Sequence, residues 1–185
     1  MNYIVLKINV KKGIVILIKK VYNNIEKGEK KMERKFEFVK RVEGKEGLKL
    51  PERATKNSAG YDFYNPERVE IEPYKLGDNP VLVKTGIKAY MGENEFLMLV
   101  NRSSNPKKKK LVIPNSVGII DSDYVDNPDN EGEIGFLFYN LSNETVVLEA
   151  GDKLGQGIFM EYKTVVDDKA EGERSGGFGS TDTKE

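Results

Sequence analysis

The sequence predicts an all-β domain, folded as an antiparallel sandwich or barrel. About ten apolar segments, each of roughly four to eight residues, recur at roughly ten-residue spacing with turn-forming residues between them. No heptad or internal repeat is present, and only the stretch near Ser104–Lys110 is typical of a helical turn. With 185 residues, the chain is long enough to bury one substantial core. Trp is absent, so Phe, Tyr, Ile, Leu and Val must build that core.

The expected strands follow one another between turn signals. Residues 35–42 (KFEFVKRV) alternate apolar and polar side chains, as do residues 68–72 (RVEIE), which stop at a proline. The run 81–91 follows the turn sequence GDNP, and the run 95–100 (EFLMLV) precedes an irregular, lysine-rich stretch. Further strands are expected within 111–121 and 133–140, and two more around the turn sequence AGD within 145–162.

Composition narrows the possible chemistry. The chain has no Cys, which excludes disulfides and thiolate sites, and no His, which removes the commonest general base. Any catalysis must therefore use carboxylates, hydroxyls, Lys, Arg or a hard, oxygen-liganded cation such as Mg²⁺. Thirty basic residues balance thirty acidic ones, so the overall charge points neither to a nucleic acid nor to a membrane as a partner.

The first 31 residues differ in character from the rest. They hold eight lysines against two glutamates, which leaves residues 32–185 with a formal net charge of −6. Polar residues interrupt YIVLKINVKKGIVILIKK well before the roughly 20 apolar residues that a membrane span needs. The segment also lacks the features of a secretory signal, and its two β-branched runs around KKG favour a hairpin followed by a charged linker.

We therefore expect three parts and a cytoplasmic location. Residues 1–31 form an N-terminal appendage, and Met32 could be the true start of the protein. Residues 32–170 form the β domain, and residues 171–185 form a flexible C-terminal arm.

Several polar motifs could carry chemistry, although each also has an ordinary structural interpretation. Arg102, Ser103 and Ser104 follow a strand and could present a cation and two donors to a phosphate, or simply form a turn. Asp121 ends the apolar segment GIID and could activate water or cap a turn. Gln156, in GDKLGQG, could orient water or phosphate, or belong to a glycine-rich turn.

The C-terminal sequence ERSGGFGSTDTKE also has two interpretations. It could be a frayed, glycine-rich tail, or an arm that wraps a phosphate-bearing ligand. Glycine lets backbone N–H groups approach phosphate oxygens closely, and Ser180 and Thr181 add hydroxyl donors. The segment lacks the Lys-Ser/Thr pair and the strand-to-helix setting of a P-loop.

Taken together and in order, five motifs resemble those of the trimeric dUTPases. They are PERATKNSAGYDF, NRSS, NSVGIIDSDY, GDKLGQGIF and RSGGFGST, and the resemblance covers Leu48 to Asp182. It implies a jelly-roll, β-clip-like antiparallel barrel that assembles as a homotrimer, with a swapped C-terminal arm and active sites built from neighbouring subunits. It also implies Mg²⁺-dependent hydrolysis of dUTP to dUMP and pyrophosphate. That reaction supplies dUMP for thymidylate synthesis and keeps uracil out of DNA.

The resemblance assigns roles at the phosphate end of the substrate. Asp121 would hold and deprotonate the water that attacks the α-phosphorus. Ser103 would contact the triphosphate near the scissile bridge, and Gln156 would position phosphate or water. Asp62 would belong to a polar network near the metal. Mg²⁺ itself would be held by phosphates and waters, without a direct protein ligand.

The resemblance also assigns roles at the nucleoside end. Asn115 and backbone groups around Ile119 and Gly135 would read the uracil edge. Tyr124 would pack against the deoxyribose and exclude a 2′-hydroxyl, while Phe178 in the arm would stack on the base. The other implied substrate-binding residues are Arg102, Ser104, Gly118, Arg174, Gly179, Ser180 and Thr181.

The chain departs from the family pattern at several positions. Asn101 stands where proline is usual, and Lys153 replaces the usual arginine of the fourth motif. Residues 125–131 lengthen the loop after the third motif, and only Ser175 separates Arg174 from the glycine pair.

Two alternatives stay open at this point. One is a dCTP deaminase on the same fold, which would depend on a glutamate such as Glu131 or Glu133 in the hairpin region. The other is a non-catalytic nucleotide sensor or protein-binding module on the dUTPase scaffold.

Overall fold

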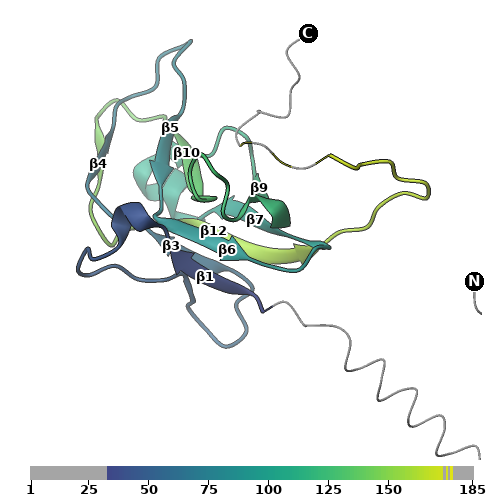
Figure 1. The fold of residues 1–185 in the computed structure, drawn as a ribbon. Helices are drawn as coiled ribbons and strands as arrows, with labels where there is room; N and C mark the ends of the chain where they lie inside the picture. The colour runs from purple at the N-terminus through teal and green to yellow at the C-terminus, as the bar shows by residue number, and fades with distance from the viewer. Residues whose placement is uncertain (1–32, 173, 175, 177–185) are drawn as a thin grey trace, which may run out of the picture. The chain divides into compact units, whose positions relative to one another are not determined.

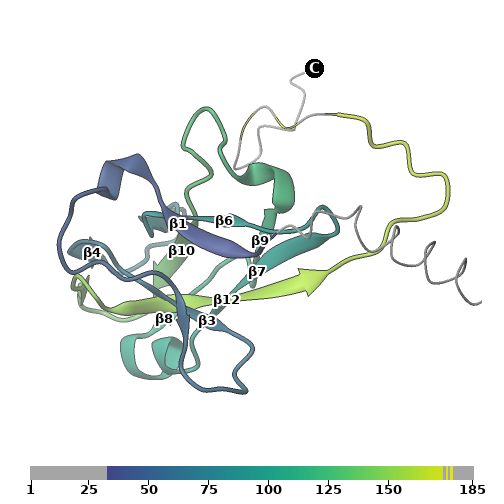
Figure 2. The same cartoon turned by 60° about the horizontal axis from the view of Figure 1, so that its bottom comes forward.

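Short alternating segments pair into four sheets (Figures 1 and 2). A computed structural model describes residues 33–172, 174 and 176, all within the unit Glu33–Glu185. The expected hairpin within residues 1–31 lies outside the described residues. The elements are β1 (Lys35–Phe38), η1 (Lys40–Val42), β2 (Glu52–Arg53), β3 (Tyr61–Tyr64), β4 (Val69–Ile71), β5 (Val81–Lys84), β6 (Ile87–Tyr90), β7 (Glu95–Asn101), η2 (Asn105–Lys109), β8 (Leu111–Val112), β9 (Gly118–Asp121), η3 (Ser122–Tyr124), β10 (Gly135–Asn140), β11 (Val146–Leu148) and β12 (Lys153–Glu161).

The largest sheet has five strands in the order β2-β3-β12-β7-β9. β12 lies at its centre and pairs antiparallel with β3 on one side and β7 on the other. The remaining sheets are β5-β10-β8, β1-β6 and β11-β4. The sequence-based prediction of an all-β, jelly-roll fold is confirmed.

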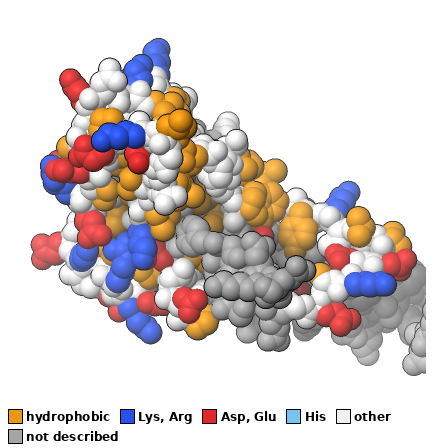
Figure 3. Space-filling view, turned by 90° about the horizontal axis from the view of Figure 1, so that it is seen from above, with side chains coloured by type: hydrophobic (Ala, Val, Ile, Leu, Met, Phe, Trp, Pro, Cys, Tyr) orange, Lys and Arg blue, Asp and Glu red, His pale blue; other side chains and the backbone are white. Residues whose placement is uncertain are grey.

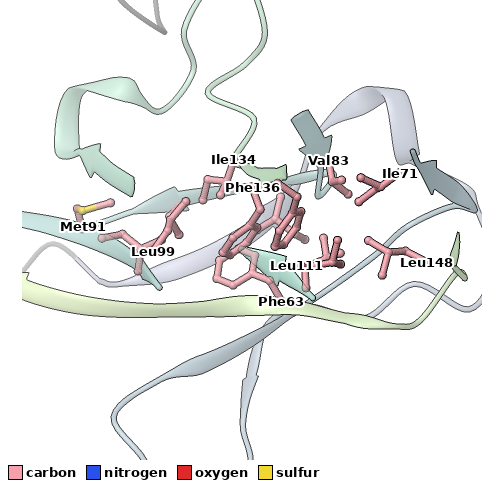
Figure 4. Close-up of a cluster of buried hydrophobic side chains, with 14 residues drawn as sticks. Phe63, Ile71, Val83, Met91, Leu99, Leu111, Ile134, Phe136 and Leu148 are labelled. Carbon is pink, nitrogen blue, oxygen red and sulfur yellow. The ribbon is translucent and has the colours of Figure 1, made fainter. Parts of the chain in front are cut away.

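One apolar core joins all four sheets (Figure 4). Phe63 from β3 and Phe136 from β10 meet edge to face, with ring centroids 5.7 Å apart. Ile71 from the β11-β4 sheet and Ile87 from the β1-β6 sheet pack into the same cluster. Because each such buried side chain stabilises the fold by about 1.5–3 kcal/mol, this cluster holds the sheets together without Trp.

The GQG sequence of the fourth motif lies in β12, at the centre of the five-stranded sheet. A Cβ atom on Gly155 would lie 2.1 Å from Cε1 of Phe136, and one on Gly157 would lie 2.7 Å from Cε2 of Phe63. The aromatic rings thus fill the space that side chains would need. Gln156, between the glycines, points to the opposite face of the sheet. The interpretation of GQG as part of a glycine-rich turn is therefore wrong.

The face of the five-stranded sheet that turns away from the core is also apolar. Along β7, partly exposed Met98 and Val100 alternate with buried Leu97 and Leu99. On the neighbouring strand, Ile158 lies opposite Met98 and therefore on the same outer face. β7 is thus apolar on both sides, as strands covered on both faces are.

Three expected strands are shorter than the patterns that predict them. The run 81–91 divides into β5 and β6, which join different sheets, because Gly86 between them has φ = 73° and lets the chain turn. Segment 111–121 divides into β8 and β9, with Ser116 at φ = 61° in the connection. Segment 35–42 is a strand only to Phe38 and continues as the 3₁₀ turn η1.

The helical turn expected near Ser104–Lys110 is confirmed as η2, which has π-helical geometry. Strand β3 is not among the expected strands, although it lies inside the five-stranded sheet. Its sequence YDFY interrupts the apolar residues with an aspartate, so the short segment gives no clear strand signal.

Charges are mixed on the visible surface. On the face drawn in Figure 3, acidic and basic side chains are interspersed with apolar ones. Within residues 33–172, 174 and 176, no helix has the length and apolar character needed to cross a bilayer.

Candidate active site

A pocket of about 260 Å³ opens beside β9, where the chain turns into η3. We call it the hairpin pocket. It brings together seven of the residues that the sequence singled out. Its lining consists of Leu99, Ile113, Asn115, Gly118, Ile119, Ile120, Asp121, Tyr124, Gly135, Phe136, Leu137 and Arg174.

Two glycines let the walls of the hairpin pocket pack closely. A Cβ atom on Gly118 would lie 3.2 Å from Leu99, its partner across β7 and β9. One on Gly135 would lie 2.6 Å from Cδ1 of Leu82 on β5. At these two positions the wall is backbone, whose N–H and C=O groups can hydrogen-bond to the edge of a flat, polar ring.

Tyr124 forms a fixed part of the pocket. Its side chain is buried, and its hydroxyl accepts a hydrogen bond from Asn130 Nδ2 at 2.8 Å. The same hydroxyl donates to the carbonyl of Glu133 at 3.3 Å. Burial raises the pKa of Tyr124, so the phenol stays neutral at physiological pH. The two hydrogen bonds of the hydroxyl therefore fix the position of the ring, whose faces are apolar.

The mouth of the pocket carries two carboxylates and one guanidinium. Arg174 donates from Nε to Asp123 at 2.7 Å and pairs with Asp121 through Nη2. Its guanidinium carbon lies 5.8 Å from the ring centroid of Tyr124, within cation–π range. The hydrogen bond to Asp123 raises the pKa of Arg174. Both carboxylates are at least half exposed, so these pairs are weak enough for a bound anion to replace them.

A second group of polar residues surrounds Asp62, which is 2% exposed. Lys153 Nζ donates to its Oδ2 at 2.6 Å, and Gln156 Nε2 donates to its Oδ1 at 3.0 Å. Arg102 Nε lies 3.8 Å from the same Oδ1. Burial raises the pKa of Asp62, but these donors outweigh it and lower the pKa overall. We call these four residues the Asp62 cluster.

The serines of the second motif lie at the Arg102 end of this cluster. Ser103 is exposed and Ser104 is partly buried, immediately before η2. Asn101 fixes this corner because its Nδ2 donates to the carbonyl of Leu111 at 3.0 Å and its Oδ1 accepts from Asn105 at 2.9 Å. A proline, which is usual at this position in the family that the motifs resemble, could make neither hydrogen bond.

The hairpin pocket and the Asp62 cluster lie toward opposite ends of β7. Asp121 pairs with Phe96 near the start of the strand, and Gln156 pairs with Val100 near its end. Four residues of strand span about 14 Å, and Arg102 lies two positions further, at about 20 Å. Within one chain, Asp121 and the Asp62 cluster are therefore too far apart to contact the same small group.

The chain is similar to known proteins over most of its length. The model of the dUTPase family matches residues 46–182. A relative from Lactococcus lactis, deoxyuridine 5′-triphosphate nucleotidohydrolase, is 45% identical over 150 residues, which are 80% of this chain and 97% of the relative. The chain belongs to the dUTPase family. Membership makes it a hydrolase of the dUTP diphosphatase class.

Solved structures agree with this assignment. The crystal structure of a dUTPase from Streptococcus mutans is 46% identical, with a TM-score of 0.64, and the match covers 70% of this chain and 97% of that one. A mutant dUTPase from Staphylococcus aureus phage phi11, solved with a structural Mg(II) ion, is 22% identical with a TM-score of 0.58 over 76% of this chain and 97% of that one. At that identity the second structure supports the fold alone.

The structure shows how the chain accommodates two differences from the usual dUTPase sequence, Lys153 in place of arginine and the longer loop 125–131. Lys153 makes the ion pair with Asp62, so a cation is retained where arginine is usual. The lengthened loop 125–131 leads back into the hairpin pocket, because Gly135 still lines that pocket.

Glu131 and Glu133, the glutamates that a dCTP deaminase would require, form contacts outside the hairpin pocket. Glu133 is buried and accepts hydrogen bonds from Arg41 Nε at 2.8 Å and from the Gly86 N–H at 2.7 Å. Glu131 faces the backbone N–H of Lys40 at 3.3 Å. Neither lines the hairpin pocket, so the structure gives the deaminase alternative no support.

Two contacts of the site carry no sequence signal. Asn130 holds Tyr124 and Asp123 holds Arg174, and sequence reasoning assigns neither role because each position is notable only for being polar. Four expected arm residues lie outside the described residues, namely Phe178, Gly179, Ser180 and Thr181.

Proposed function

We propose that this protein hydrolyses dUTP to dUMP and pyrophosphate in the cytoplasm. The observation that carries this proposal is the hairpin pocket, in which Asp121, Asn115 and Tyr124 share one cavity in a dUTPase-family chain. Its physiological result would be a supply of dUMP for thymidylate synthesis and the exclusion of uracil from DNA.

Uracil would bind in the hairpin pocket. Asn115 and the backbone around Ile119 and Gly135 would pair with its polar edge, and cytosine would leave those groups unpaired. Sites built in this way reject a mismatched edge by up to about 10⁴-fold. Tyr124 would lie against the deoxyribose, and its fixed ring would leave no room for a 2′-hydroxyl.

Asp121 would be the general base. A water held by its carboxylate would attack the α-phosphorus, forming a new P–O bond while the bond from that phosphorus to the bridging oxygen of the β-phosphate breaks. The proton would pass to Asp121, and pyrophosphate would leave. The half-exposed carboxylate leaves room for both water and phosphate once Arg174 turns to the substrate.

The triphosphate would be bound by a second subunit. The separation supports this, because Asp121 and Gln156 of one chain are offset by about 14 Å along β7 and lie on strands on opposite sides of it. Ser103, Ser104 and Arg102 of a neighbouring chain would contact the phosphates, with Gln156 orienting them and Asp62 holding Gln156 and Lys153 in place.

The partner that we propose is another copy of the same chain, in a homotrimer. The outer face of the five-stranded sheet supports an interface, because Met98, Val100 and Ile158 would otherwise expose apolar surface on a central strand pair. This face continues into Gln156, so a copy seated there would lie beside the Asp62 cluster. A closed ring gives every copy the same contacts.

Mg²⁺ fits this arrangement as a phosphate-bound ion. The described residues contain no group of three or more acidic side chains that could hold a metal, and Asp62 is already paired with Lys153. Since Mg²⁺ keeps several waters and readily takes phosphate ligands, the substrate and waters would supply most of its coordination. When bound, it would neutralise charge on the triphosphate and on the leaving pyrophosphate.

The arm would close the site. Phe178 would stack on uracil, while Arg174, Gly179, Ser180 and Thr181 would hold the distal phosphates and shut out bulk water. In a trimer with swapped arms, this segment would come from another chain, and its Arg174 would take the place that the same-chain Arg174 has at the pocket mouth.

A product assay tests the proposal. Purified protein with Mg²⁺ is expected to release pyrophosphate rather than orthophosphate from dUTP, and to leave UTP, dTTP and dCTP intact. Ammonia released from dCTP would indicate a deaminase, and binding of dUTP without turnover would indicate a sensor. Equal turnover of UTP and dUTP would overturn the substrate assignment.

A further inference from the structure

The lengthened loop after the third motif folds back directly over Tyr124. The Asn127 N–H donates to the Tyr124 carbonyl at 3.3 Å. Gly132 has φ = 75°, and a Cβ atom there would lie 2.4 Å from the same carbonyl oxygen. Only glycine allows so close a return, so the loop packs against the backbone of the tyrosine that borders the pocket.

Asn130 connects this loop to the tip of the Tyr124 side chain. Its Oδ1 accepts from the Gly132 N–H at 2.9 Å, and its Nδ2 donates to the Tyr124 hydroxyl at 2.8 Å. Its own carbonyl accepts from the Glu133 N–H at 3.0 Å. The amide is therefore oriented on one side by the loop backbone, which aims its N–H group at the phenol.

The loop is anchored to the body of the domain at both ends. Asp126 pairs with Lys88 Nζ at 2.5 Å and accepts from the Tyr90 hydroxyl at 3.0 Å. At the other end, the carboxylate of Glu133 is held by Arg41 and by the Gly86 N–H. These contacts restrain both ends of the loop and so fix the backbone that carries Asn130.

We propose that Asn130 is a positioning residue that sharpens discrimination between deoxyribose and ribose by holding the ring of Tyr124 in place. This inference rests on the proposed function, in which Tyr124 excludes the 2′-hydroxyl. The phenol has two partners, Asn130 and the Glu133 carbonyl. Losing the shorter of them frees the ring to tilt about its side-chain torsions and make room for the extra hydroxyl.

The test compares kcat/KM for UTP with kcat/KM for dUTP in four variants. Asn130→Ala removes the hydrogen bond between Asn130 and Tyr124, and Tyr124→Phe removes that bond together with the one to the Glu133 carbonyl. Asn130→Ala is expected to raise the UTP-to-dUTP ratio by about 2- to 10-fold, the factor that one neutral hydrogen bond is worth, and Tyr124→Phe by at least as much. The double variant should match Tyr124→Phe, because the hydroxyl that Asn130 contacts is already absent there. Asp129→Ala, at an exposed position in the same loop, is the matched control and should keep the wild-type ratio.

Melting temperatures show whether each variant is folded. If Asn130→Ala does not fold, Asn130→Ser replaces it, since the serine hydroxyl can still accept from the Gly132 N–H but is too short to reach the Tyr124 hydroxyl. An unchanged ratio in a folded Asn130 variant would overturn the inference, as would a second, equal rise in the double variant. Wild-type protein that does not hydrolyse dUTP would remove the proposed function and the inference together, whereas selective wild-type hydrolysis with an unchanged Asn130 variant removes the inference alone.

Discussion

The hairpin pocket and the Asp62 cluster differ in polarity and in the burial of their charged groups. The pocket is mostly apolar, with glycine backbone in its walls and exposed carboxylates at its mouth. The cluster buries one carboxylate between two hydrogen-bond donors and a nearby guanidinium. A pocket of the first kind suits a flat, uncharged ring, whereas the second kind holds side chains rigidly in place beside an anion.

The difference lies also in how easily each region can rearrange. The pairs of Arg174 with Asp121 and Asp123 involve half-exposed carboxylates, so a substrate can displace them at little cost. Asp62 is almost fully buried and cannot lose its partners without leaving an unpaired charge. We infer that chemistry and closure occur at the hairpin pocket and that the Asp62 cluster stays unchanged through the cycle.

The largest expected effect is at the hairpin pocket. Asp121→Asn keeps the shape of the side chain but removes the proton acceptor, so turnover should fall by about 10²- to 10⁴-fold while nucleotide binding and folding stay nearly unchanged. Single-turnover kinetics and a dUTP-binding isotherm measure the two separately. Wild-type turnover in this variant would show that Asp121 is not the base, and Asp123, at the same pocket mouth, would be tested next.

The arm should have the next largest effect. Removing the chain from Arg174 onward should leave a folded but almost inactive protein, and Phe178→Ala should weaken binding or turnover by about 5- to 150-fold, as expected from loss of one base–aromatic stack. Limited proteolysis provides the second measurement, with the arm cut readily alone and protected by a non-hydrolysable dUTP analogue with Mg²⁺. Full activity after truncation would make the tail dispensable.

Lys153 should affect stability more than the catalytic step. Lys153→Met leaves Asp62 without its nearest cation, and should cost about 1–3 kcal/mol in the free energy of unfolding, between a surface and a buried pair. Lys153→Arg is the matched control and should retain most of that stability. Chemical denaturation of all three proteins measures the difference.

The same pair predicts a pH dependence. The folded pKa of Asp62 is lowered, so its stabilising contribution is complete above the ordinary aspartate value of about 3.9 and is lost as pH falls through the lower, folded value. The stability difference between wild type and Lys153→Met should therefore be full at neutral pH and shrink below about pH 4. A difference that grew on acidification would contradict the role of this pair.

The smallest effect is expected at the N-terminus. We propose that residues 1–31 are an appendage to the domain at 32–170, because the family match begins only at residue 46. Starting the protein at Met32 should leave activity and oligomeric state unchanged, as measured by dUTP turnover and size-exclusion chromatography with light scattering. Loss of either would assign these residues a structural role.

The hairpin pocket is more predictable from the sequence than the rest of the fold is. Several of its residues belong to one contiguous motif, so the amino-acid sequence alone places Asp121 and Tyr124 close together. β3 could not be predicted, because four residues with a central aspartate carry little local signal and become a strand only by pairing with β12. The division of the run 81–91 into β5 and β6 could not be predicted either, because it depends on the positive φ of Gly86 alone.

The contacts of single polar residues are the least predictable. Asn130 donates to Tyr124 six residues earlier, but only because the intervening loop returns over the tyrosine backbone. Asp62 lies more than 90 residues from Lys153 and Gln156, and their meeting follows from the pairing of β3 with β12. Such contacts depend on long-range pairing that composition and periodicity do not encode.

Mixing two inactive variants tests most directly whether a complete site needs two chains. Asp121→Asn damages only the hairpin pocket, and Arg102→Ala damages only the far end of β7, beside Ser103 and Ser104. If sites form between neighbouring copies, unfolding and refolding an equal mixture should restore about a quarter of the wild-type activity, since half of the pockets and half of the clusters in a randomly mixed ring are intact. Each variant refolded alone should stay inactive. A mixture no more active than its two components would contradict the account, because it would mean that each chain completes its own site.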